Sequence, residues 1–525
     1  MQFLAGGRLA RPLLSKAGET PALHNVSAAA DAIGRGGTPM NRSLTINRRR
    51  FLGAAAACGA AGALALPAQG AVSPSVANLP ARSNVVIRNA HVITIVPGEA
   101  DLPNGDVRVE NGTIVDVGAG LSAPGLPSID GSGFILMPGM VDTHWHMWTT
   151  LLRNMSGNTP EHGYFPTTTA VGNVYNPRDM YYGTLLSSAE ALFSGITTVH
   201  DWCHNIITPQ HAEEDIRALQ ETGIRARFSY GPARRMPATE AINTDDVERF
   251  HRDWASSSNE GLLTLGLGWR GVQAPFRLPD GKFELRPLPE AVYRKEHDAA
   301  RKVGIPISVH LNSTTNDRGH ILALQKQGLL VKDLQIVHGI FSSPEEMKAM
   351  AAAGAVASVS PYSELRIGFG ITKILEYLDN GVTLGLSVDT TPLTGNSDMF
   401  GIMKAVQNIE NGRAENEFKL PARRVVELAT IEGARSLGLA DRIGSIAKGK
   451  RADLIMVNTR DINMGPFTDP YYMLVDSAQP WNVDTVMVDG RILKRGGKLT
   501  AIDTGMLMAE ASKVSREVRD RAKWW

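Results

Sequence analysis

The chain of 525 residues lacks several features that would narrow its class. It has two cysteines, Cys58 and Cys203, so a disulfide framework is excluded and cysteine usage does not reveal the compartment. Its formal net charge of +1 offers no basic surface for nucleic acid or for an anionic membrane. Hydrophobic content of 43% and charged content of 20% are ordinary for a globular protein. We expect two domains and a large core.

No apolar run is long enough to span a bilayer, but one resembles an export signal. Three arginines, Arg48 to Arg50, precede an uncharged run rich in alanine and glycine at residues 53–66, and a small-residue site follows at 67–71. The paired arginines are typical of a twin-arginine signal. Residues 1–71 are therefore predicted to be an N-terminal extension and signal that contains Cys58. Translation starts at Met1 or Met40, and the mature protein is expected in the periplasm or outside the cell, without a membrane anchor.

Two separated stretches carry short alternating strands. Residues 85–95 and 106–117 form the first set, with Asn111 and Gly112 as a hairpin turn. Residues 452–457 and 483–493 form the second set. We predict that segments 83–137 and 437–500 pair as one discontinuous β-sandwich, followed by a terminal helix within 501–525.

Between them, residues 138–436 alternate short apolar strands with helical stretches, which is typical of a (β/α)8 barrel. The predicted fold class is therefore α/β, a distorted TIM barrel with a discontinuous small β-sandwich. The expected strands end near His146, Asp201, Tyr230, Trp269, His310, His338, Pro361 and Asp389. The intervening helices are predicted at 179–193, 213–221, 245–255, 289–302, 321–327, 344–352 and 371–378.

The end of the first predicted barrel strand carries His144 and His146. Alternate residues of a strand face the same way, so the two imidazoles lie on one side and Trp145 on the other. Such a pair at a strand end makes half of a metal site. Taken alone, the pair fits two loop histidines without a metal at least as well.

Three further strand ends change that balance. His310 and His338 close two predicted strands, and Asp389 closes the eighth. All parallel strands of a barrel end on one face, where active sites lie. The chain has 13 histidines, so one at a strand end could be chance, whereas four with a carboxylate on one rim indicate a metal centre.

The set of His144, His146, His310, His338 and Asp389, inside a barrel with a split β-domain, resembles the amidohydrolase superfamily over roughly residues 83–500. Local matches at 137–142, 195–199, 444–453 and 488–490 support the resemblance. Residues 387–389 followed by 396–400 are similar to the branch that holds cytosine deaminase, guanine deaminase and the s-triazine hydrolases.

The resemblance implies a ligand set of His144, His146, His310 and Asp389. The strand at 263–269 has no lysine that could bridge a second metal, so we predict one divalent transition ion, Zn²⁺ with Fe²⁺ as the alternative. Such an ion lowers the pKa of bound water toward about 7 and supplies hydroxide. Asp389 is expected to take the proton, and His338 to stabilise the adduct or, alternatively, to bind the metal.

One position departs from the family pattern. Deaminases of this branch carry glutamate three residues after the histidine of the fifth strand, and here that residue is Ser313. Serine is a poor proton donor to a leaving amine. Glu364, near the end of the seventh strand, is a candidate replacement acid or a binder of a cationic substrate group, and a solvated loop glutamate is the competing interpretation.

The predicted function is that of a hydrolase, which acts on carbon–nitrogen bonds other than peptide bonds. It attacks a small-molecule substrate, a cyclic or aromatic nitrogen compound, with metal-activated hydroxide, as aminohydrolases and triazine hydrolases do. An amide, carbamate or urea hydrolase with the same metal site is the first alternative, and a metal-containing binding protein without catalysis is the second. The oligomeric state stays open, with a homodimer common among relatives.

Overall fold

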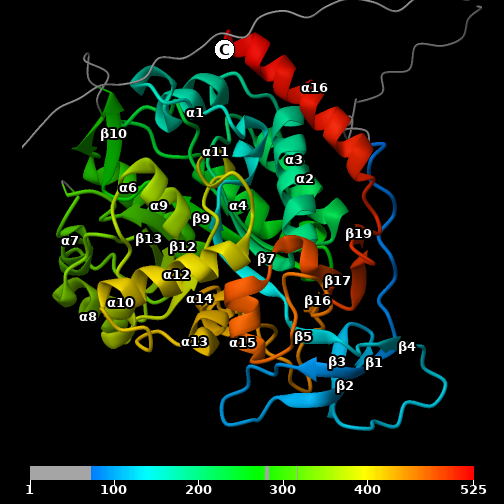
Figure 1. Cartoon of the computed structure of the whole chain (residues 1–525). Coiled ribbons are helices and arrows are strands. Elements are labelled where there is room, and N and C mark those ends of the chain that lie inside the picture. Colours follow the sequence, from blue (N-terminus) through cyan, green and yellow to red (C-terminus); the bar gives the residue numbers. More distant parts are fainter. Residues whose placement is uncertain (1–72, 278–282, 316, 525) are drawn as a thin grey trace, which may run out of the picture. The chain divides into compact units, whose positions relative to one another are not determined.

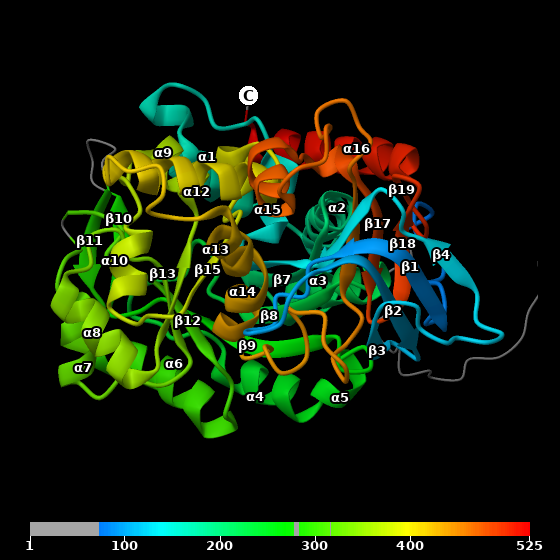
Figure 2. The same ribbon diagram turned by 60° about the horizontal axis from the view of Figure 1, so that its bottom comes forward.

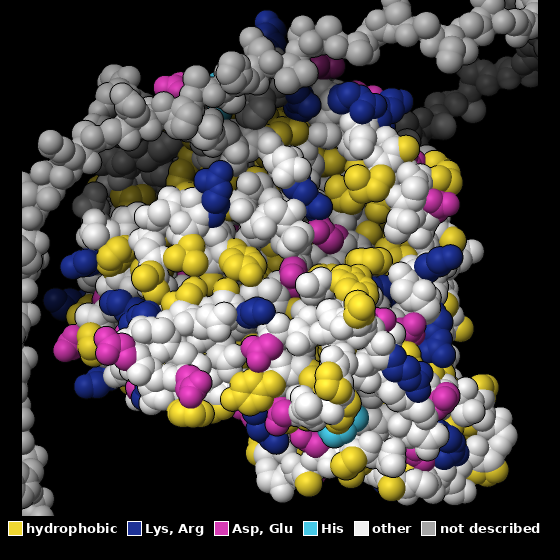
Figure 3. Space-filling model, viewed as in Figure 1, with side chains coloured by type: hydrophobic (Ala, Val, Ile, Leu, Met, Phe, Trp, Pro, Cys, Tyr) yellow, Lys and Arg dark blue, Asp and Glu magenta, His cyan; other side chains and the backbone are white. Residues whose placement is uncertain are grey.

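The computed structural model describes residues 73–277, 283–315 and 317–524. The predicted signal, residues 1–71, lies outside them. None of the helices described combines the length and the apolar character that crossing a bilayer requires. Figure 3 shows lysine and arginine interspersed with aspartate and glutamate on one face, in keeping with the formal charge of +1.

Eight parallel strands form the predicted barrel, each hydrogen-bonded to the next. The ring closes where the first strand meets the chain after the eighth. His146 N donates to Asp389 O at 2.7 Å, and Asp389 N donates to His144 O at 2.9 Å. The strands are β6 (Met140–Trp145), β7 (Ile196–Cys203), β8 (Arg225–Tyr230), β9 (Leu263–Trp269), β12 (Ile307–Leu311), β13 (Leu334–His338), β14 (Val356–Val359) and β15 (Leu384–Leu386).

Helices alternate with these strands and surround them (Figure 2). Seven of them match the predicted helical stretches to within a few residues, and the others were not predicted. The helices are η1 (Met147–Leu152), α1 (Tyr164–Gly172), α2 (Pro177–Ser194), α3 (Pro209–Thr222), α4 (Thr244–Arg252), α5 (Trp254–Ser257), α6 (Glu290–Val303), α7 (His320–Lys326), α8 (Pro344–Ala353), α9 (Pro361–Ile367), α10 (Ile374–Asp379), α11 (Thr391–Thr394), α12 (Met399–Arg413), α13 (Ala422–Glu427) and α14 (Gly433–Ser436). A hairpin, β10 (Gln273–Arg277) and β11 (Phe283–Pro287), follows β9.

Local sequence signals set the ends of these helices. α2 begins with a capping box between Asn176 and Asp179. It is closed by Gly195 as the C-cap, whose φ of +90° is favourable for glycine because glycine has no Cβ. α8 begins in the same way, with Ser343 and Glu346 as the reciprocal pair. Each cap satisfies backbone groups that a helix terminus leaves without a partner.

A second sheet joins the segments that precede and follow the barrel (Figures 1 and 2). Within it β5 pairs with β16 antiparallel, so segments far apart in sequence share one core. Asn111 and Gly112, at φ of +46° and +77°, form the predicted hairpin turn. The strands are β1 (Val85–Val92), β2 (Leu102–Glu110), β3 (Thr113–Gly118), β4 (Ser128–Asp130), β5 (Phe134–Pro138), β16 (Leu454–Asn458), β17 (Val483–Val488), β18 (Arg491–Arg495) and β19 (Lys498–Leu499). The predicted domain boundaries stay a prediction.

The C-terminal helix α16 (Thr504–Ala522) packs against α1 and α2 (Figure 1). Ser515 Oγ donates to Leu151 O at 2.9 Å, which ties the helix to the segment just after β6. A short helix, α15 (Pro470–Tyr472), lies between β16 and β17.

Two predicted strand ends are wrong by a few residues. β14 ends at Val359 rather than near Pro361, because proline there starts α9, a position that suits a residue without an N–H. β15 ends at Leu386 rather than near Asp389, because Asp389 has a φ of +64° and cannot continue a strand. Glu364 therefore lies in a helix, not in a loop.

Candidate metal centre

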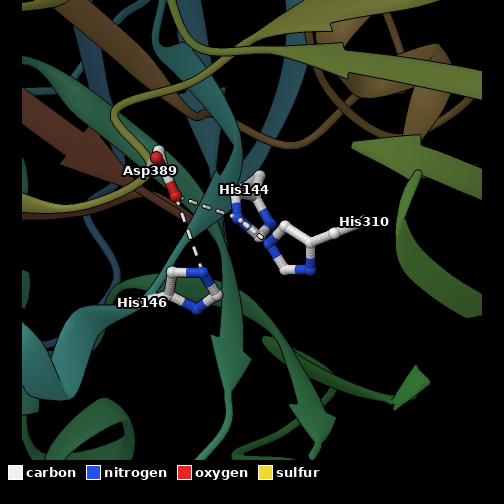
Figure 4. Close-up of side chains that lie close together, drawn as sticks. All are labelled: His144, His146, His310 and Asp389. Atoms are coloured by element: carbon white, nitrogen blue, oxygen red, sulfur yellow. Dashed lines mark hydrogen bonds and ion pairs between the residues drawn. The ribbon is translucent and has the colours of Figure 1, made fainter. Parts of the chain in front are cut away.

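The four predicted metal ligands converge at the C-terminal end of the barrel (Figure 4). One ligand atom from each of His144, His146, His310 and Asp389 lies within 4.8 Å of all the others. His144 Nε2 is 3.2 Å from His310 Nε2 and 3.2 Å from Asp389 Oδ1. Donor atoms around a tetrahedral Zn²⁺ lie about 3.3 Å apart, given bonds of about 2.0–2.2 Å. Nitrogen and oxygen donors at this spacing fit such an ion.

The protonation states suit metal binding. Burial lowers the pKa of His144 and His310, and burial together with the charge of His144 lowers the pKa of His146 to about 3. The imidazoles are therefore neutral at pH 7, as ligands must be. Burial alone would raise the pKa of Asp389, but the hydrogen bond with His144 and the nearby histidines hold it well below its usual range. Asp389 is therefore ionised.

Neighbouring groups fix the orientation of two of these ligands. His146 Nδ1 donates to Trp202 O at 2.9 Å, which leaves Nε2 facing the cluster. Ser363 Oγ donates to Asp389 Oδ2 at 2.5 Å, so Oδ1 is the oxygen that faces the imidazoles.

His338 lies beside the cluster, with its ring centroid 5.3 Å from that of His310. Its Nδ1 donates to Glu364 Oε1 at 3.1 Å, which leaves Nε2 available. Burial alone would lower the pKa of His338, but the hydrogen bond to Glu364 and the charges of Asp389 and Glu364 raise it. His338 is therefore suited to hold a proton near neutral pH.

Glu364 is 0% exposed, and both of its carboxylate oxygens are engaged. Oε1 accepts from Ser360 N at 2.8 Å as well as from His338, and Oε2 accepts from Thr372 Oγ1. Glu364 is therefore not a solvated loop glutamate, and both of its oxygens already accept hydrogen bonds from the protein. The geometry favours a role in holding His338, and direct proton transfer by Glu364 stays an untested prediction.

The chain at the ends of these strands is strained. His338 and Asp389 have φ values of +70° and +64°, and Asn312, two residues after His310, has +53°. Residues other than glycine seldom adopt this conformation, and such positions cluster at functional sites. No carboxylate stands at Ser313, whose backbone N–H donates to Asp317 Oδ2 at 3.2 Å.

Sequence reasoning missed Ser363, Tyr164 and Arg234. Ser363 contacts Asp389, and Tyr164 is close enough for the charge of Asp389 to raise its pKa, in addition to burial. Arg234 follows β8 on the same face of the barrel. The rule that found the histidines, polar residues just after a strand, would also have found Arg234.

Comparison with known proteins agrees with this geometry. The model of the amidohydrolase family matches residues 135–493. The chain belongs to the amidohydrolase family. The 5-methylthioadenosine/S-adenosylhomocysteine deaminase of Desulfitobacterium hafniense (strain DSM 10664 / DCB-2) is 30% identical over 459 residues, which cover 84% of this chain and 98% of the relative. The 5'-deoxyadenosine deaminase of Methanosarcina barkeri is 26% identical over 457 residues, with 84% and 99% covered.

Two solved structures share the fold of this amidohydrolase. An adenosine deaminase from Xanthomonas campestris with bound zinc has a TM-score of 0.73 and 23% identity, with 85% of this chain and 99% of that chain covered. The atrazine chlorohydrolase TrzN from Arthrobacter aurescens TC1, complexed with zinc, has a TM-score of 0.69 and 21% identity, with 82% and 100% covered. The predicted family, fold class and enzyme class, a hydrolase of carbon–nitrogen bonds, are confirmed.

Proposed function

We propose that this amidohydrolase holds one divalent ion, Zn²⁺, and hydrolyses a carbon–nitrogen bond of a cyclic or aromatic nitrogen compound. The observation that carries the proposal is the convergence of three neutral imidazoles and one ionised carboxylate, with His338 beside them. His144, His146, His310 and Asp389 would hold the ion. When bound, it would lower the pKa of a water molecule and polarise the group under attack.

The chain's own residues supply the proton transfers. Asp389 is ionised and its Oδ1 faces the cluster, so it can accept a proton from the attacking water. The hydrogen bond to Glu364 and the charges of Asp389 and Glu364 raise the pKa of His338 and so favour its imidazolium form, which carries a second proton on Nε2 and can donate it to negative charge that develops on the substrate. Ser363 and Glu364, adjacent on α9, thus hold one of these two groups each.

Ser313 favours a second candidate, an amide, carbamate or urea hydrolase. The family's glutamate would protonate a leaving amine, and a hydroxyl near its ordinary pKa does so poorly. A carbonyl substrate places its negative charge on oxygen, where His338 can act. The relatives that act on nucleosides and triazines support a heterocyclic substrate, whereas Ser313 supports an amide, carbamate or urea substrate.

A substrate screen of the metal-loaded protein separates the two. Adenosine, 5-methylthioadenosine, 5'-deoxyadenosine and atrazine would be tested for release of ammonia, amine or chloride, and a panel of amides and carbamates for release of acid. His310→Ala serves as the blank. Equal turnover by wild type and His310→Ala, or an active protein free of transition metal in elemental analysis, would contradict the proposed function.

Export and assembly are further parts of the proposal. The arginines at 48–50 and the uncharged run at 53–66 support twin-arginine export to the periplasm. A reporter fused after residue 71 would reach the periplasm only with both Arg48 and Arg49 present. The possibility of a homodimer would be tested by light scattering on the purified protein.

A further inference from the structure

Arg234 carries a charge that nothing in the described part of the chain balances. It lies in the segment between β8 and α4, on the face where the metal centre lies. One terminal nitrogen donates to Thr168 Oγ1 at 3.1 Å. Its Nε is shielded from solvent and has no hydrogen-bond partner, and among the described residues no aspartate or glutamate forms an ion pair with it.

The side chain of Arg234 packs next to the wall of the metal centre. A Cβ added at Gly172 would lie 3.1 Å from the ring of Trp148 and 3.4 Å from Cγ of Arg234, so both side chains border the C-terminal end of α1. Trp148 Nε1 donates to His204 Nδ1 at 3.1 Å, and the ring of His204 is 3.9 Å from that of His146.

Tyr164 lies near enough to Arg234 and to Asp389 for the charge of each to act on its phenol. Burial and the charge of Asp389 raise the pKa of Tyr164, whereas the charge of Arg234 lowers it. The phenol therefore lies in the fields of both groups. Burial also lowers the pKa values of His146, His204 and His310, and the charge of Arg234 lowers them further.

The charge of Arg234 has no counter-ion among the residues that the structure describes. Glu364 is occupied by His338 and Thr372, and Asp389 faces the imidazoles. Arg234 is partly exposed, and only its Nε is fully shielded from solvent. A partly buried cation without a counter-ion among the described residues costs free energy, which a ligand of opposite charge would offset. Phe369, 5.5 Å from the ring of His338, and Phe165, 6.5 Å from Phe369, add aromatic surface of the kind that packs against a planar ring.

We propose that Arg234 binds an anionic oxygen of the substrate, so that the substrate is a planar nitrogen heterocycle with a carboxylate or an ionised ring oxygen. The inference rests on the proposed function, since it names the substrate of the same site. The guanidinium presents a fork of donors, which suits either oxygen group and fixes the ring relative to the metal centre.

Binding of small probes to the zinc-loaded protein tests this without turnover. Calorimetry would compare nicotinate with nicotinamide for a carboxylate, and barbiturate with uracil for an ionised ring oxygen. For at least one pair, wild type is expected to bind the anion about tenfold or more tightly than the neutral partner, as for a hydrogen bond to a charged group. Arg234→Gln is expected to lose about that factor for the anion and to leave the neutral probe unchanged.

Matched variants separate this result from general damage. Arg235→Gln removes the adjacent, exposed arginine and is expected to match wild type. Arg234→Lys keeps the charge without the fork and is expected to bind with intermediate affinity, and it provides the comparison if Arg234→Gln does not fold. Zinc content should stay equal in all variants.

Three results would overturn the proposal. They are anion affinity in Arg234→Gln within twofold of wild type, equal losses for anionic and neutral probes, and no preference for either anion in wild type. An anion that binds the zinc directly would give the first result. A protein that binds anions through Arg234 but hydrolyses no compound in the screen would contradict the proposed function alone.

Discussion

Both ends of the barrel bury charged side chains, but they treat them differently. At the N-terminal end, Arg225 begins β8 and pairs with Asp453 at 2.6 Å and with Asp489 at 3.5 Å. Arg82 and Arg451 also reach Asp489, at 2.6 and 2.5 Å. Every charge in this group has a partner of opposite sign.

At the C-terminal end the charges are left open. Three neutral imidazoles face one carboxylate, and His338 and Asp389 have positive φ values. Within the described part of the chain, Arg234 has no anionic partner. Stability requires the first arrangement, since a buried unpaired charge is costly. A catalytic site requires the second arrangement, because its unpaired ligand atoms and charges are there to bind the metal and the substrate, and strained backbone is common at such sites. The N-terminal end of the barrel holds the barrel against the second sheet, and the C-terminal end is arranged to bind metal and substrate.

The largest expected effect is at the open end. His310→Ala removes one of four converging donors, so we expect loss of the bound metal and of activity. The loss of metal affinity and activity should exceed the roughly 10- to 100-fold that follows removal of a residue that only hydrogen-bonds a metal ligand. Elemental analysis and the substrate screen measure both. His251→Ala, an exposed histidine on α4, is the control, and normal metal content in His310→Ala would contradict the ligand set.

The paired end should respond in stability rather than in chemistry. Arg225→Met leaves Asp453 buried without its partner and is expected to cost about 3–5 kcal/mol of unfolding free energy. Urea unfolding measures this, and zinc content and turnover of the folded protein should not change. Arg108→Met breaks a partly exposed pair with Glu110 at 3.2 Å, whose side chains are 30% and 45% exposed, and should cost about 1 kcal/mol or less. Equal losses of unfolding free energy in the two variants would contradict the stabilising role of the paired charges at the N-terminal end of the barrel.

Glu364→Gln tests how the open end is organised. The amide cannot balance a protonated His338, so kcat should fall about 10- to 100-fold while KM and zinc content change little. Glu345→Gln, an exposed glutamate in the first turn of α8, is the control. Unchanged kcat in Glu364→Gln would remove Glu364 from the reaction.

The smallest effect concerns acid stability at the paired end. Burial alone would raise the pKa of Asp489, but hydrogen bonds from Arg451 and Arg82 hold it below the ordinary value of 3.8. The ionised form therefore stabilises the fold above pH 3.8, and this contribution is lost as the pH falls through the folded pKa. The free-energy difference between wild type and Asp489→Asn should shrink over that range in urea unfolding. A pH-independent difference would contradict the shift.

Much of the fold was predictable because hydrophobic period and caps are local. The strand pattern, the capping box at Ser343 and the Asn111–Gly112 turn each act within a few residues. Errors occurred where backbone geometry overrides pattern, at Pro361 and at Asp389. The site was predictable to the same extent, since strand-end histidines meet on one rim of a barrel.

The amino-acid sequence alone determined the barrel, the identity of the converging side chains and the absence of a glutamate at residue 313. Only the tertiary structure decided that Glu364 is enclosed behind His338, and that Arg234 has no counter-charge among the described residues near the centre. The physical reason is that a pattern fixes which face a residue occupies. Which partner satisfies its charge depends on loops and helices brought together from distant parts of the chain.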